Sequence, residues 1–195
     1  MTELLPGTQR KFITYPAYRR EAKDCDILLW EPRRLYGRVV AMATDGPFSH
    51  ASAAVWWGSR LMSVGYDEQR GGVAVPLKTE VYQNPGCISV FRVRGKLDRH
   101  NVRDALIDSL GHRYEWGLIV RFGWLALPFV KLCPPLRRFA ERFVADSPGA
   151  FCSQYIHRAF LKGGDGMYLC RKSSFETTPN DLGRSAILDY LGTLE

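Results

Sequence analysis

The sequence predicts an α+β fold in which helices pack against an antiparallel sheet. Short apolar or alternating runs follow one another between residues 26 and 93, and turn residues separate them, as in antiparallel strands. Helical spacing of apolar residues then begins at Asp98 and returns at Cys152. A sheet of closely spaced strands flanked by helices is an α+β layer architecture.

The chain has 195 residues, the size of one domain with a substantial core. Hydrophobic residues make up 46% and charged residues 24%, which is ordinary for a soluble globular chain. The net charge of +7 favours either an anionic partner or a solvated basic face. Because the basic residues are scattered and form no long run, we expect no nucleic-acid partner.

The five cysteines predict free thiols, because their number is odd, their spacings are long and no Cys-X-X-Cys motif occurs. Free thiols fit a reducing compartment. The segment from Met1 to Tyr18 lacks the basic and then apolar pattern of an export signal. We therefore expect a cytoplasmic protein, and nothing in the motifs implies a metal or an organic cofactor.

The chain is predicted to consist of an N-terminal arm followed by a single domain. Residues 1–23 are polar and mixed and form the arm, and residues 24–195 form the domain. The domain opens with a short apolar strand over 26–30. A short helix over 35–43 follows, and Asp45-Gly46-Pro47 is a turn signal.

The next residues predict the rest of the sheet. A strand from His50 to Trp57 and its antiparallel partner from Arg60 to Tyr66 form a hairpin, joined by the turn Gly58-Ser59. Alternation over Gly71 to Leu77, and again over Cys87 to Val93, predicts two further strands.

The second part of the chain is predicted to be helical. Residues 98–110 have near-helical spacing of apolar residues, with Asp98 as the cap. A second helix runs over 152–161 and ends at Gly163-Gly164. Residues 178–182 start a short helix or turn, and 187–191 form a last strand or a tail.

Two residues in this layout point to nucleophilic chemistry. Cys152 starts a helix, where the helix dipole lowers the pKa of a thiol, and His50 opens a strand. An imidazole beside the thiol can take its proton, but the two residues are 102 positions apart (152 − 50), so only the fold can join them. His157 is the rival base, but it lies five residues after Cys152 and points to a different side of the same helix.

The segment 117–146 is unusually apolar for its position. Arg121, Pro128 and Lys131 interrupt it, so it does not predict a membrane span. Three interpretations remain: a buried helix pair, a lid over the site, or an interfacial element that contacts lipid through residues 117–143.

Seven short motifs, taken in order, resemble the permuted branch of the NlpC/P60 superfamily of papain-like cysteine hydrolases, which includes YiiX-like and lecithin:retinol acyltransferase-like enzymes. The order is the specific feature, because the histidine precedes the cysteine and the unpermuted enzymes have the reverse. The matching motifs are Asp24-Cys25-Asp26-Ile27-Leu28, Ser49-His50-Ala51, Gly72-Val73-Ala74-Val75-Pro76-Leu77, Val90-Phe91-Arg92-Val93, Gly111-His112-Arg113-Tyr114-Glu115-Trp116, Phe151-Cys152-Ser153-Gln154-Tyr155 and Thr178-Pro179-Asn180-Asp181-Leu182.

The resemblance implies a circularly permuted papain-like fold, with a small antiparallel sheet packed against the helix that carries the nucleophile. The family usually has a third polar residue, often glutamate or histidine, on the strand after the histidine strand. Here that strand, residues 60–66, offers only Ser63 as a well-placed polar side chain. Either Ser63 or a water orients His50, or Asp67 and Glu68 reach back, or the site is a dyad.

The resemblance also implies the activity. Cys152 would attack an amide or ester carbonyl through a thioacyl enzyme, with its own backbone N–H and, more weakly, Tyr155 at the oxyanion. The substrate would be a peptide, as in cell-wall amidases and peptidases, or a lipid-linked acyl group, cleaved by hydrolysis or moved by acyl transfer. The alternative is a catalytically inactive papain-like domain that serves as a binding module.

Overall fold

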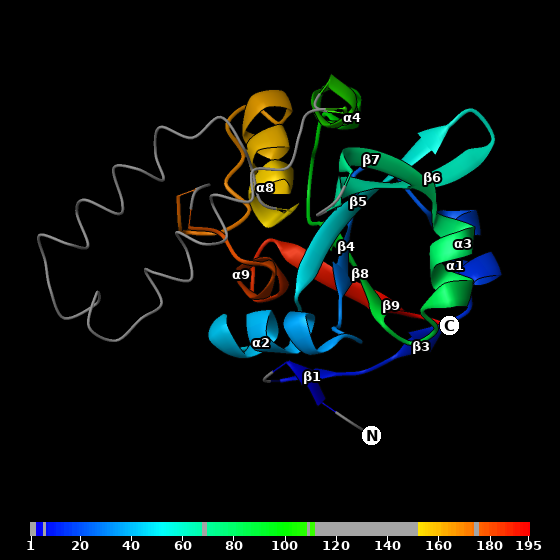
Figure 1. The fold of residues 1–195 in the computed structure, drawn as a ribbon. Helices are drawn as coiled ribbons and strands as arrows, with labels where there is room; N and C mark the ends of the chain where they lie inside the picture. The colour runs from blue at the N-terminus through cyan, green and yellow to red at the C-terminus, as the bar shows by residue number, and fades with distance from the viewer. Residues whose placement is uncertain (1–2, 6, 68–69, 109, 112–151, 174–175) are drawn as a thin grey trace, which may run out of the picture.

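The computed structural model describes residues 3–5, 7–67, 70–108, 110–111, 152–173 and 176–195 (Figure 1). A seven-stranded sheet runs through the molecule in the order β3-β9-β8-β4-β5-β6-β7. Its strands are β3 (Phe12–Ile13), β4 (Asp26–Trp30), β5 (His50–Trp57), β6 (Arg60–Asp67), β7 (Gly71–Pro76), β8 (Ile88–Val93) and β9 (Leu188–Leu194).

The α+β class is confirmed, but the sheet differs from the small antiparallel sheet that the sequence predicts. It has seven strands, and β3 pairs with β9 in parallel while the other neighbours are antiparallel. The parallel pair joins Phe12 to Thr193, so residues from the two ends of the chain meet at one edge. Local alternation cannot reveal such a pairing.

Helices cover both faces of the sheet (Figure 1). On one face, α1 (Tyr15–Glu21) and α3 (Leu77–Gln83) pack with Leu28 and Ala54. On the other face lie α4 (Arg99–Asp108), α8 (Cys152–Gly163) and α9 (Pro179–Gly183). Strand alternation produces the two layers, because neighbouring residues of β5 such as Ala53 and Ala54 enter different cores.

One further helix lies beside the end of the sheet at which β5 begins. This helix, α2 (Leu35–Ala43), leads through a short loop into β5, and α9 lies next to it (Figure 1). Asn180 of α9 is fully buried and holds this loop in place through three hydrogen bonds. Its amide nitrogen donates to the Phe48 carbonyl at 2.8 Å and to Thr44 Oγ1 at 2.7 Å. Its amide oxygen accepts from the Phe48 N–H at 2.9 Å. The backbone two residues before His50 is therefore fixed.

A buried carboxylate ties the start of β4 to the rest of the sheet. Asp26 is fully buried, and Arg92 of β8 donates to it twice, at 2.7 and 2.6 Å. The Tyr18 hydroxyl of α1 donates to the same carboxylate at 3.1 Å. These charge-assisted bonds satisfy the oxygens, so the group has a structural role.

Two predictions concern segments rather than strands. The N-terminal residues contain β1 (Glu3–Leu5) and β2 (Thr8–Gln9), which pair with each other, as well as β3 and α1. The division of the chain at residue 23 stays a prediction.

The apolar segment 117–146 lies outside the described residues, and no helix within the described ranges has the length and hydropathy to cross a membrane.

Candidate active site

Cys152 is the first residue of α8, as the sequence predicts. Its side chain is buried, with 8% of the residue exposed. The first turn of α8 lies over one end of the β5–β6 pair, because the Tyr155 and Tyr66 rings are in contact with centroids 4.9 Å apart. Tyr66 is the residue before Asp67, the last residue of β6. The helix N-terminus that carries the thiol is therefore at the end of the sheet where β5 begins.

His50 is the first residue of β5 and is half-buried. Its ring lies edge-on against Trp30 of β4, with centroids 6.0 Å apart and an interplanar angle of 71°. Burial lowers the pKa of His50 from 6.5 to about 4, and the negative charge of Asp67 acts in the opposite direction. At neutral pH the imidazole is therefore uncharged and able to accept a proton.

Asp67 is the acidic group that the strand register brings to His50. The β5–β6 register pairs Ser52 with Gly65, and two more residues along each strand set Asp67 opposite His50. Arg70 holds Asp67 in turn, with its backbone N–H at 3.0 Å and its guanidinium at 3.3 Å from the carboxylate. The sequence leaves Asp67 open as one of several third residues, and its role beside His50 stays a prediction.

Ser63 lies further from His50. It pairs with Ala54, four residues along β5, which corresponds to roughly 14 Å at the rise of a strand. Its hydroxyl donates to Ser52 Oγ at 2.9 Å, and Ser52 Oγ also accepts from the Trp30 indole N–H at 3.0 Å. Any orienting effect of Ser63 would therefore reach His50 only through Ser52 and Trp30.

His50 and the N-terminus of α8 lie at the same end of the sheet, but strand alternation directs the imidazole away from α8. Trp30, the cross-strand neighbour of His50, packs in the layer that contains α1 and α3. Alternation directs His50 to the same side, whereas α8 covers the opposite face. Its ring contact is with Trp30 of that layer, and the pairing of His50 with Cys152 stays a prediction.

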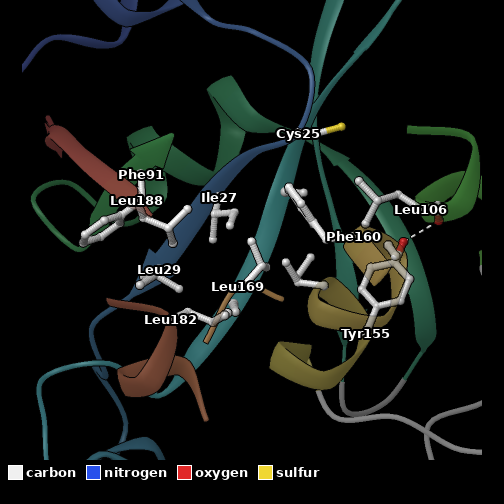
Figure 2. Packing of buried hydrophobic residues seen from close by; sticks show 14 of the residues in the cluster. Cys25, Ile27, Leu29, Phe91, Leu106, Tyr155, Phe160, Leu169, Leu182 and Leu188 are labelled. Atoms are coloured by element: carbon white, nitrogen blue, oxygen red, sulfur yellow. Dashed lines mark hydrogen bonds between the residues drawn. The ribbon is translucent and has the colours of Figure 1, made fainter. Parts of the chain in front are cut away.

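Tyr155 has a structural partner in this arrangement. Its hydroxyl donates to the Leu106 carbonyl of α4, and the ring is buried among core side chains (Figure 2). Burial raises the pKa of the Tyr155 phenol well above its ordinary value of 10.0. With its only proton engaged by Leu106, the hydroxyl leaves the predicted oxyanion role to the Cys152 backbone N–H.

The other thiols in the described part of the chain have different surroundings. Cys25 opens β4 from a left-handed backbone conformation, and burial raises the pKa of its thiol to about 12, as expected of an inert core cysteine. Cys87 is half-buried, and burial raises the pKa of its thiol as well. Cys133 lies outside the described residues.

Cys170 and His157 form a contact that the sequence does not predict. The Cys170 sulfur is 3.8 Å from His157 Nδ1, and Thr177 Oγ1 lies 2.7 Å from the same nitrogen. Burial lowers the pKa of His157, so this ring is neutral. Cys170 and Thr177 follow His157 by 13 and 20 positions, a spacing that no sequence motif joins.

No metal site emerges from the described residues, since no group of three histidine, cysteine or acidic side chains there is arranged to hold an ion.

The mixed sheet with helices on both faces defines a YiiX-like α+β fold. The chain is similar to the crystal structure of the metalloprotein YiiX from Escherichia coli O157:H7, with a TM-score of 0.62 and 13% identity over 88% of this chain and 97% of that chain. At this identity the likeness shows the fold alone. No protein-family model and no curated protein matches the sequence.

Proposed function

We propose that this protein is a cysteine hydrolase that cleaves an amide or ester bond through a thioacyl-enzyme intermediate. Cys152 is the nucleophile and His50 is the general base. The observation that carries the proposal is the position of the first turn of α8 over the Tyr66 end of the β5–β6 pair. It supports the proposal, because the N-terminus of α8 and the first residue of β5 lie at the same end of the sheet.

In the proposed reaction, the Cys152 sulfur attacks the carbonyl carbon while its proton passes to His50. The Cys152 backbone N–H, at the N-terminus of α8, donates to the carbonyl oxygen as negative charge develops there. His50 then returns the proton to the leaving nitrogen or oxygen. Water, deprotonated by His50, releases the acyl group as a carboxylic acid and restores the thiol.

The electrostatics of His50 suit this role. The ring is uncharged at rest, because burial holds its pKa at about 4. When the thiolate forms, its negative charge adds to that of Asp67, and both favour the imidazolium. Asp67 would therefore stabilise the charged base in the way the third member of a triad does, although the family usually has glutamate or histidine there.

The pH dependence of iodoacetamide alkylation at Cys152 tests the proposal, with mass spectrometry to separate this thiol from the other four. The wild-type thiol should react well below the free-cysteine pKa of roughly 8.5. His50→Ala should remove that advantage. His100→Ala, which alters an exposed histidine of α4, is the matched control and should have no effect.

The result that contradicts the proposal is a Cys152 thiol that titrates like ordinary cysteine in the wild type and in His50→Ala alike. The papain-like domain would then be a binding module. If alkylation depends on His50, the substrate follows from hydrolysis of peptide amides and lipid esters by the wild type, with Cys152→Ser as the inactive reference.

A further inference from the structure

The short helix α2 exposes a continuous apolar stripe. Leu35 is 79% exposed, Val39 is 58% exposed and Met42 is 81% exposed. These residues are spaced at i, i+4 and i+7, so they lie on one face of the helix. A surface helix normally turns polar residues to solvent, and an exposed stripe of large apolar side chains indicates a surface that is covered in use.

The helix α2 is packed against the rest of the protein, so loose attachment does not explain the exposure of the stripe. Its opposite face is held against the body, where a side chain at Gly37 would collide with Pro32 and with Ser49, the neighbour of His50. Ala41, one turn further on, is only 5% exposed. The helix therefore has two apolar faces, and the core covers only one of them.

The flank of the stripe is basic. Arg34 and Arg38 are both exposed and stand one turn apart beside Leu35 and Met42. Arg33 is exposed as well, and its guanidinium donates to the Gln83 carbonyl at 2.6 Å. An apolar stripe with arginines along its edge is the pattern of a helix that lies in the interface of an anionic bilayer.

The position of α2 connects this surface to the proposed active site. The helix ends at Ala43, Asn180 clamps the following loop through Thr44 and Phe48, and His50 comes next. In Figure 1, α2 lies at the end of the molecule where β5 begins. A bilayer under α2 would therefore lie beside the rim that carries His50.

We propose that α2 docks this protein on an anionic membrane surface, with Leu35, Val39 and Met42 in the acyl region and Arg34 and Arg38 at the lipid headgroups. Docked there, the protein would have its proposed active site next to lipid, so we assign a lipid-linked acyl group as the substrate class. This second part rests on the proposed hydrolase function, whereas the docking itself does not.

Flotation with vesicles tests the docking, using the full chain with Cys152→Ser so that no chemistry interferes. Vesicles of phosphatidylcholine with phosphatidylserine should carry the protein, and Leu35→Ser with Met42→Ser should weaken binding by about ten-fold or more. Arg34→Gln with Arg38→Gln should weaken it roughly twenty- to thirty-fold on these vesicles and have little effect on phosphatidylcholine alone. The matched control is Trp57→Ser, which removes an apolar side chain that is 53% exposed at the far end of β5.

The proposal is overturned if the Cys152→Ser protein with an unchanged α2 binds neither kind of vesicle, or if the α2 variants bind as well as that protein does. In the latter case the bilayer contact belongs to another part of the chain, such as the predicted segment 117–143. A dimer in analytical ultracentrifugation that Leu35→Ser with Met42→Ser abolishes, without vesicle binding, would assign the stripe to a second copy and also refute it. Alkylation of Cys152 is measured without vesicles, so failure of the hydrolase and failure of the docking are separate results.

Discussion

Replacing Glu80 with glutamine should stabilise the protein at alkaline pH and leave it nearly unchanged at acidic pH. Glu80 lies in α3, its carboxyl hydrogen-bonds to the Ser63 side chain, and its buried Oε2 has no hydrogen-bond partner in the described part of the chain. Burial raises the pKa of Glu80 from 4.5 to about 7, more than the Ser63 bond and the Arg70 charge lower it. Glutamine keeps the shape and removes the charge.

The pKa shift gives the size of the effect. The folded protein holds this proton up to a pH of about 7, whereas the unfolded chain releases it near 4.5. Unfolding therefore releases a proton within that window, and the free energy of unfolding falls as the pH rises through it. At about 1.4 kcal/mol for each pKa unit, the full cost above the window is about 3 kcal/mol. The glutamine variant does not incur this cost.

Urea unfolding followed by tryptophan fluorescence measures the difference between variant and wild type on both sides of the window. The advantage of Glu80→Gln should be near zero below the window and reach about 3 kcal/mol above it. Glu176→Gln, at an exposed site, is the matched control and should show no such trend. An equal difference at both pH values would refute the reasoning, because it would assign the effect to packing rather than to ionisation.

The remaining predictions concern the base, the loop clamp and the buried ion pair. Burial lowers the pKa of His50 from 6.5 to about 4, so as the pH falls the unfolded chain binds this proton before the folded protein does. The free energy of unfolding should therefore decrease as the pH drops through that window. His50→Gln should flatten this pH dependence, as measured by urea unfolding in the acid range. Asn180→Ala should cost about 2–4 kcal/mol in denaturant unfolding, because it leaves the buried Phe48 N–H and carbonyl without partners. Asp26→Asn should cost about 3–5 kcal/mol, whereas Asp189→Asn, which breaks an exposed pair, should have a much smaller effect; equal losses would contradict the role assigned to burial.

Much of the strand pattern is predictable from the sequence because alternation is local. The hairpin predicted from His50 to Trp57 and from Arg60 to Tyr66 is observed with one extra residue at the end of β6. The pairing of β3 with β9 is not predictable, because it joins two-residue and seven-residue runs from opposite ends of the chain. Periodicity also fails at α3, where a seven-residue helix follows directly on a strand.

The site is predictable to a smaller extent. The position of Cys152 at the start of its helix is predictable because helical spacing of apolar residues begins there. The effect of the Asp67 charge on the pKa of His50 depends on the register of the hairpin, and a slip of one residue would change that register. The raised pKa of Glu80 depends on burial between α3 and β6, which no motif encodes.

The position of His50 at the end of β5 explains why the alkylation and the acid titration should be read together. His50 is the first residue of β5, at the end of the sheet over which the first turn of α8 lies. If Cys152 and His50 share a proton, then alkylating the thiol removes the negative charge that favours the imidazolium, and the pKa of His50 should drop further. The acid-range slope of stability should then extend to lower pH in the alkylated protein. A slope that alkylation leaves unchanged would show that His50 and the thiol titrate independently, whatever the reactivity of Cys152.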